Sequence, residues 1–89
     1  MAIVYQMQGK YEQALEAYSK SLDIKIKLVG DMHRLVADTK YNIAYVHKKR
    51  GETEVAKKLY LECETIYATV YGPDHSETTD AAQQARDCA

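Results

Sequence analysis

The sequence predicts an all-α fold, a solenoid of antiparallel helix pairs with about five helical segments. Three observations predict it. The 89 residues contain only four glycines and one proline, so few turns interrupt long helices. Between the glycines, apolar residues recur at the spacing of one helix face. The chain also resembles itself when it is shifted by 42 residues, which is typical of stacked helical repeats.

The internal repeat is visible as ten identities in the 47 residue pairs that this shift aligns. The identical pairs are Ala2/Ala44, Val4/Val46, Gly9/Gly51, Glu12/Glu54, Ala14/Ala56, Tyr18/Tyr60, Ile24/Ile66, Gly30/Gly72, His33/His75 and Asp38/Asp80. The glycine pairs fall where a helix should end, and the alanine and tyrosine pairs fall on helix faces. The position of these matches indicates a true structural period.

The glycines divide the chain into the predicted segments. Residues 1–8 form the second half of a helix that ends before Gly9. Helices follow over 11–29, 34–49 and 53–71, each with an apolar stripe, and the last of these ends before Gly72 and Pro73. Residues 76–88 form the final helix. The small residues Ala44 and Ala56 predict a close approach of two helices.

Motif residues within the period carry a family resemblance. Repeat two contains Lys40-x2-Ile43-Ala44-x2-His47 and then Ala56-x3-Tyr60, and repeat one keeps Ala2-x2-Tyr5 and Ala14-x3-Tyr18. This pattern resembles the tetratricopeptide repeat, a helix–turn–helix unit that stacks into a solenoid. The period of 42 residues and the stretch Tyr71-Gly72-Pro73-Asp74-His75 are similar to the long repeats of kinesin light chains.

The resemblance covers essentially all 89 residues and implies a single tetratricopeptide-like domain. Residues 1–30 would be a partial repeat one, residues 31–72 repeat two, and residues 73–89 the first helix of repeat three. In this family the first helix of each pair lines the concave face of the solenoid. That face of the helix 34–49 would present the following candidate peptide-binding residues: Asp38, Tyr41, Asn42, Tyr45, Lys48 and Lys49.

These residue types suit peptide binding. The Asn42 amide offers a donor and an acceptor to a peptide backbone, and the tyrosines offer rigid contact area. Lys48 and Lys49 favour an acidic ligand. We therefore expect a protein-interaction scaffold that binds an extended or acidic peptide segment in a helix-lined groove. The alternative is a self-association module whose repeats form an oligomer.

The alternative rests on the N-terminal end, where an apolar half-helix lacks its preceding turns. Its apolar residues are Ala2, Ile3, Val4, Tyr5 and Met7. A homodimer through this end would cover them. The helix over 76–88, which has no Leu, Ile, Val or aromatic residue, can instead serve as a polar cap.

Composition and motif content argue against several other classes of protein. The formal charge of −1 disfavours nucleic-acid binding, and no apolar run is long enough to span a membrane. No nucleophile–base pair, phosphate loop or metal-ligand cluster is present, so we expect no enzyme activity, cofactor or metal. Cys63 and Cys88 lack CxxC spacing, which favours a reducing, cytoplasmic location. His33 and His75 each follow a helix-ending glycine and are expected to cap or pack locally.

Overall fold

Four helices account for most of residues 11–88, the part of the chain that the computed structural model describes. They are α2 (Tyr11–Val29), α3 (Arg34–Lys49), α4 (Thr53–Val70) and α5 (Ser76–Asp87). The predicted all-α fold is confirmed, and each helix begins at its predicted residue. The helices α4 and α5 end one residue earlier than predicted. The predicted half-helix over 1–8 lies outside the described residues.

Three glycines end the helices because each adopts a left-handed backbone. Gly30, Gly51 and Gly72 have φ angles of 84°, 82° and 106°. A residue with a Cβ atom adopts this conformation only at a cost, whereas glycine adopts it freely. The sequence identities Gly9/Gly51 and Gly30/Gly72 therefore include positions where the backbone itself requires glycine.

Two histidines cap the N-termini of α3 and α5. The His33 Nδ1 atom accepts a hydrogen bond from the backbone N–H of Leu35 at 3.1 Å, and His75 does the same for Glu77 at 3.1 Å. Each imidazole thus satisfies one of the N–H groups that a helix start leaves without a partner. The capping role predicted for both histidines is confirmed.

The helices pack through two adjoining clusters, with α4 in the middle. One cluster is formed around Val36 and Ala37 of α3, Cys63, Ile66 and Tyr67 of α4, and Ala81 of α5. The other contains Ala44 of α3, Ala56 and Tyr60 of α4, and Ala85 and Cys88 at the end of the chain. Each cluster joins three helices, so α3 and α5 are held at a fixed spacing by α4.

Alanine and tyrosine have the complementary roles that the repeat predicts. Ala44, Ala56 and Tyr60 are all completely buried in one cluster. Because alanine has only a methyl group, α3 and α4 approach closely at this crossing, and the Tyr60 ring fills the space beside it. The Tyr41 ring packs edge-on against the Tyr60 ring, with their centroids 5.1 Å apart.

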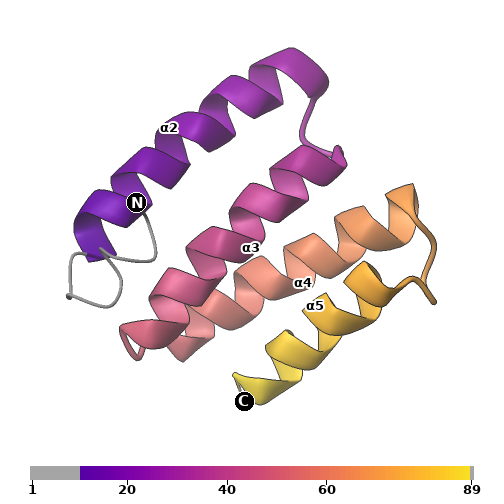
Figure 1. Cartoon of the computed structure of the whole chain (residues 1–89). Helices are drawn as coiled ribbons and strands as arrows, with labels where there is room; N and C mark the ends of the chain where they lie inside the picture. The colour runs from indigo at the N-terminus through magenta and orange to yellow at the C-terminus, as the bar shows by residue number, and fades with distance from the viewer. Residues whose placement is uncertain (1–10, 89) are drawn as a thin grey trace.

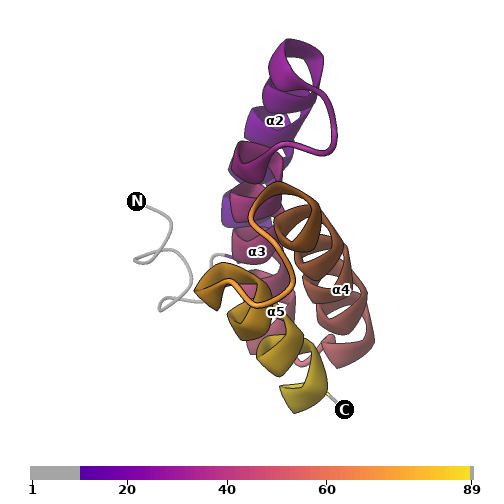
Figure 2. The same cartoon turned by 90° about the vertical axis from the view of Figure 1, so that its right-hand side faces the viewer.

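The helices alternate in direction and form a short array (Figure 1). Among the described residues, α2 lies at one end of this array and packs chiefly on α3, while α4 packs on both α3 and α5. The side view shows α4 and α5 next to each other at the opposite end from α2 (Figure 2). The helices α3 and α5 run in the same direction, as the first helices of successive repeats do.

Enlarging Ala56 should weaken the fold. We expect Ala56→Leu to force the closely packed α3 and α4 apart and to reduce the free energy of unfolding by roughly 1–3 kcal/mol. Urea unfolding followed by circular dichroism measures this. Lys58→Leu is the matched control, because Lys58 is an exposed residue of the same helix. Equal stability of the two variants would contradict the close crossing.

The histidine cap of α3 allows a test of a different kind. Replacing His33 by alanine removes the acceptor for the Leu35 N–H and should cost about 1 kcal/mol of unfolding free energy. His33→Asn should recover most of that loss, because an asparagine oxygen accepts the same bond. If thermal melts find the asparagine variant as unstable as the alanine variant, the imidazole does not act as a cap.

Candidate peptide-binding groove between α3 and α5

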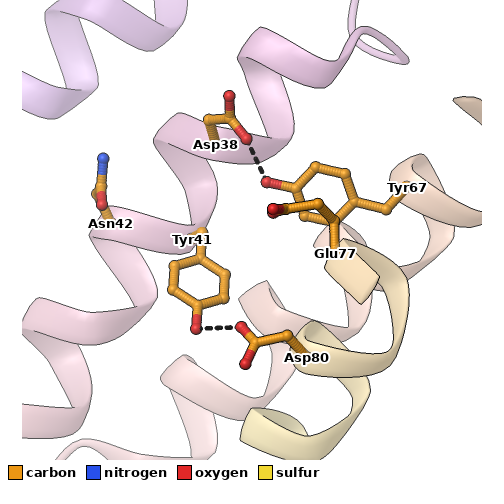
Figure 3. Close-up of a pocket in the computed structure, with 6 residues that line it drawn as sticks. All are labelled: Asp38, Tyr41, Asn42, Tyr67, Glu77 and Asp80. Atoms are coloured by element: carbon orange, nitrogen blue, oxygen red, sulfur yellow. Dashed lines mark hydrogen bonds between the residues drawn. The ribbon is translucent and has the colours of Figure 1, made fainter. Parts of the chain in front are cut away.

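A cavity of about 290 Å³ lies between α3, α5 and the end of α4. Figure 3 shows the six residues that line it. They are Asp38, Tyr41 and Asn42 of α3, Tyr67 of α4, and Glu77 and Asp80 of α5. Side chains from three helices therefore meet at one site, and the site exists only when these helices are packed together.

Two tyrosine hydroxyls hold two of the carboxylates in place. The Tyr41 hydroxyl donates to Asp80 Oδ2 at 2.5 Å, and the Tyr67 hydroxyl donates to Asp38 Oδ1 (Figure 3). Each bond crosses from one helix to another. Asp38 and Asp80 occupy the same position in successive repeats, so the two bonds place equivalent carboxylates on either side of the cavity.

Of the two tyrosines that support the cavity, Tyr67 is buried and Tyr41 is partly buried, and this raises the pKa of both hydroxyls. Burial first, and then the bonded and nearby carboxylate of Asp80, raises the pKa of Tyr41 well above its usual value. Burial and Asp38 do the same for the pKa of Tyr67. Both hydroxyls therefore stay protonated, and remain hydrogen-bond donors to the carboxylates, even near pH 10 where a free tyrosine ionises.

The charge along α3 changes sign between the cavity and the end of the helix. Asp38, Glu77 and Asp80 make the cavity acidic. Lys48 and Lys49 lie near the other end of α3, where the Lys48 ammonium donates to Gln84 Oε1 at 3.1 Å and the Lys49 Nζ atom lies 5.2 Å from the centre of the Tyr45 ring. A ligand that lay along α3 from the cavity toward Lys48 would meet negative charge first and positive charge about three helical turns later.

The structure brings together part of the site that the sequence predicts. Asp38, Tyr41 and Asn42 line the cavity, whereas Tyr45, Lys48 and Lys49 lie beyond it on the same helix. Tyr41 is partly buried by its contacts with Tyr60 and Asp80, so its ring supports the cavity as well as facing it. Whether these six residues bind a peptide stays a prediction.

Sequence reasoning missed the contributions of α4 and α5. Tyr67, Glu77 and Asp80 lie 25 or more residues from the predicted site residues that they contact or adjoin, and only packing brings them near. One signal was available, because Asp38 and Asp80 are identical across the repeat. Equivalent carboxylates on parallel first helices would be expected to face one groove.

The two cysteines take no part in this groove. Both are free and buried, and the Cys63 thiol donates to the Ala37 carbonyl oxygen at 3.2 Å. Burial raises the pKa of the Cys63 thiol to about 12, so it is a poor nucleophile. Within residues 11–88 no three His, Cys, Asp or Glu side chains are placed to hold a metal ion. The same residues include no helix with the length and apolarity that a membrane span requires.

Comparison with known proteins agrees with the fold of stacked helices. A family model described as tetratricopeptide repeat matches residues 1–69. The chain therefore belongs to the tetratricopeptide repeat family, a fold of stacked helix pairs that mediates protein–protein interaction and is not itself an enzyme fold.

A curated relative supports the same assignment. The chain is 30% identical over 82 residues to Tetratricopeptide repeat protein 23 of Bos taurus, an alignment that covers 92% of this chain. It covers 18% of that relative, so the chain spans less than a fifth of the relative's length. The narrower likeness to kinesin light chain repeats stays a prediction.

Proposed function

We propose that this chain is a protein-interaction scaffold that binds an extended peptide segment in the groove between α3 and α5. The observation that carries the proposal is the cavity of about 290 Å³ lined by side chains of three helices. Its polar groups are positioned before any ligand arrives, because Tyr41 and Tyr67 already fix two of the carboxylates. Because these side chains are already ordered, ligand binding loses less conformational entropy at the site.

The charges of the groove define the ligand further. Asp38, Glu77 and Asp80 favour a lysine or arginine side chain in the cavity. Lys48 and Lys49 favour an acidic residue at the other end, as the sequence alone suggests. The ligand we propose therefore carries both charges. Asp38 and Lys48 are ten positions apart, which is a rise of roughly 15 Å along the helix, a distance that about four or five extended residues cover.

Asn42 is suited to hold the backbone between these two charges. It is exposed and lies between the acidic cavity and the lysine end of α3. Its amide can donate to a peptide carbonyl and accept from a peptide N–H at the same time. This contact does not depend on the ligand's side chains, so the spacing of the two charges would provide the specificity.

Self-association remains the second candidate. Ile24 and Leu28 of α2 are 59% and 77% exposed, and a second copy of the chain could cover them. The predicted homodimer contact through residues 1–7 lies outside the described residues. Sedimentation equilibrium across concentration tests this candidate, because it requires an oligomer without added ligand.

We also propose a reducing, cytoplasmic location. Cys63 and Cys88 are both free thiols, which agrees with a compartment where disulfides do not form. Mass spectrometry of the protein purified from cells under alkylating conditions would detect two unoxidised cysteines if the proposal is right.

The ligand proposal predicts a charge-dependent interaction with a simple probe. The probe is a blocked peptide in which arginine and glutamate are separated by four alanine or serine residues, and its control has glutamine in place of both. We expect the charged peptide to bind more tightly, and Asp38→Asn combined with Asp80→Asn to weaken it about tenfold. Asparagine keeps an oxygen that can accept the tyrosine bonds while it removes the charge. Isothermal titration calorimetry gives the affinities.

Matched variants distinguish binding in the groove from nonspecific attraction between the charged peptide and the protein surface. Asp31→Asn removes an exposed carboxylate in the turn before α3 and should leave binding unchanged. Asn42→Ala combined with Lys48→Glu and Lys49→Glu should abolish binding and preserve the helical circular dichroism. Equal binding of the charged and neutral peptides, or equal binding to all variants, would overturn the proposal.

A further inference from the structure

The hydroxyl of Tyr60 is a buried polar group without a partner. Tyr60 is completely buried. Among the buried side-chain oxygen and nitrogen atoms of residues 11–88, its hydroxyl oxygen is the one that makes no hydrogen bond. The hydroxyls of Tyr41 and Tyr67, by contrast, each donate to a carboxylate. An unpaired buried donor costs free energy, which an acceptor supplied by a ligand would recover.

This hydroxyl lies close to both helices that form the groove. Burial raises the pKa of Tyr60 most, and Cys88, Cys63, Asp80 and Tyr45 raise it further. These electrostatic effects weaken with distance, so the hydroxyl is near α5 at Asp80 and Cys88 and near α3 at Tyr45. The Tyr60 hydroxyl is therefore at the floor of the groove, between α3 and α5.

One side-chain hydrogen bond crosses the groove beside this hydroxyl. Tyr60 packs in a cluster with Ala44 of α3 and Ala85 of α5. Lys48 follows Ala44 by one helical turn, Gln84 directly precedes Ala85, and the Lys48 ammonium donates to Gln84 Oε1 at 3.1 Å. Both side chains are partly exposed and long, so they can move apart and open the groove above Tyr60.

We propose that Lys48 and Tyr60 together bind the carboxylate of an acidic residue of the ligand. The carboxylate would replace the Gln84 amide oxygen at the Lys48 ammonium, because a charged acceptor forms the stronger bond. Its second oxygen would accept from the Tyr60 hydroxyl. Gln84 is then the residue that occupies Lys48 until the ligand arrives. This subsite depends on the proposed peptide binding, and it identifies the groups that select the acidic residue.

A neutral amide of the ligand is the competing occupant. Asp80 lies near the Tyr60 hydroxyl and disfavours a second carboxylate there. The Lys48 ammonium has the opposite effect, and it would contact the bound carboxylate directly. Asp80 also already accepts a hydrogen bond from the Tyr41 hydroxyl. The attraction to Lys48 is therefore the larger of the two effects, and a carboxylate is favoured over an amide.

Removing the hydroxyl alone tests whether it is unpaired in the ligand-free chain. Tyr60→Phe keeps the ring and should leave the Tm unchanged or raise it, because no hydrogen bond is lost. Tyr67→Phe loses the bond to Asp38 and should lower the Tm by about 5 °C. Thermal melts followed by circular dichroism measure both. If Tyr60→Phe melts as early as Tyr67→Phe, the hydroxyl is paired within the chain and the proposal is wrong.

The binding test uses the charged peptide described above and a version in which alanine replaces only its glutamate. Isothermal titration calorimetry should show tighter binding of the glutamate peptide. Tyr60→Phe should weaken the glutamate peptide about tenfold and leave the alanine peptide unchanged. Tyr18→Phe is the matched control, because Tyr18 is equivalent to Tyr60 in the repeat but lies on α2, away from the groove. It should change neither affinity.

The outcomes separate this subsite from the function on which it depends. If Tyr60→Phe weakens both peptides equally, or neither, the hydroxyl does not contact the carboxylate. That result contradicts the subsite and leaves peptide binding in the groove intact. If neither peptide binds the unmodified chain, the proposed peptide binding itself is wrong, and the subsite is wrong with it.

Discussion

The packing of two tyrosines of α4 between α3 and α5 is the interaction on which the rest of the described structure depends. Tyr60 and Tyr67 are buried to within 2% of their surface, and each contacts a cluster that includes residues of both neighbouring helices. Rings of this size fix the distance between the two first helices, and the alanines around them allow the backbones to approach. Without these rings the groove would have no defined width.

The same tyrosines connect the core to the surface chemistry. The Tyr67 ring lies in the core, and its hydroxyl reaches Asp38 at the wall of the cavity. Tyr41 packs against Tyr60 and binds Asp80 on the opposite wall. The positions of both carboxylates are thus consequences of core packing.

The sequence was informative wherever structure is local. Gly30, Gly51 and Gly72 and the histidines after two of them mark the helix ends, and these signals act within a few residues, so the predicted helices agree with the observed ones. Only half of the residues that line the cavity were predicted. The residue spacing on one helix identifies Asp38 and Asn42, but it does not identify the residues of α4 and α5 that lie across from them. Tyr67 illustrates the reason, because the position of its hydroxyl depends on how three helices pack together. The division of the chain into repeats stays a prediction.

Ionisation of the tyrosines tests this account most directly. Burial raises the pKa of Tyr41, Tyr60 and Tyr67 in the folded chain, whereas an unfolded tyrosine ionises near pH 10. The unfolded chain therefore releases protons first, so folding stability falls as the pH rises above about 10 and is unaffected by these groups below it. Carbon-13 NMR of the tyrosine Cζ atoms, recorded with circular dichroism, follows both events. We predict that these three resonances change only when the helices unfold. Their reversible titration near pH 10 in a fully helical chain would contradict the buried packing of the α4 tyrosines between α3 and α5.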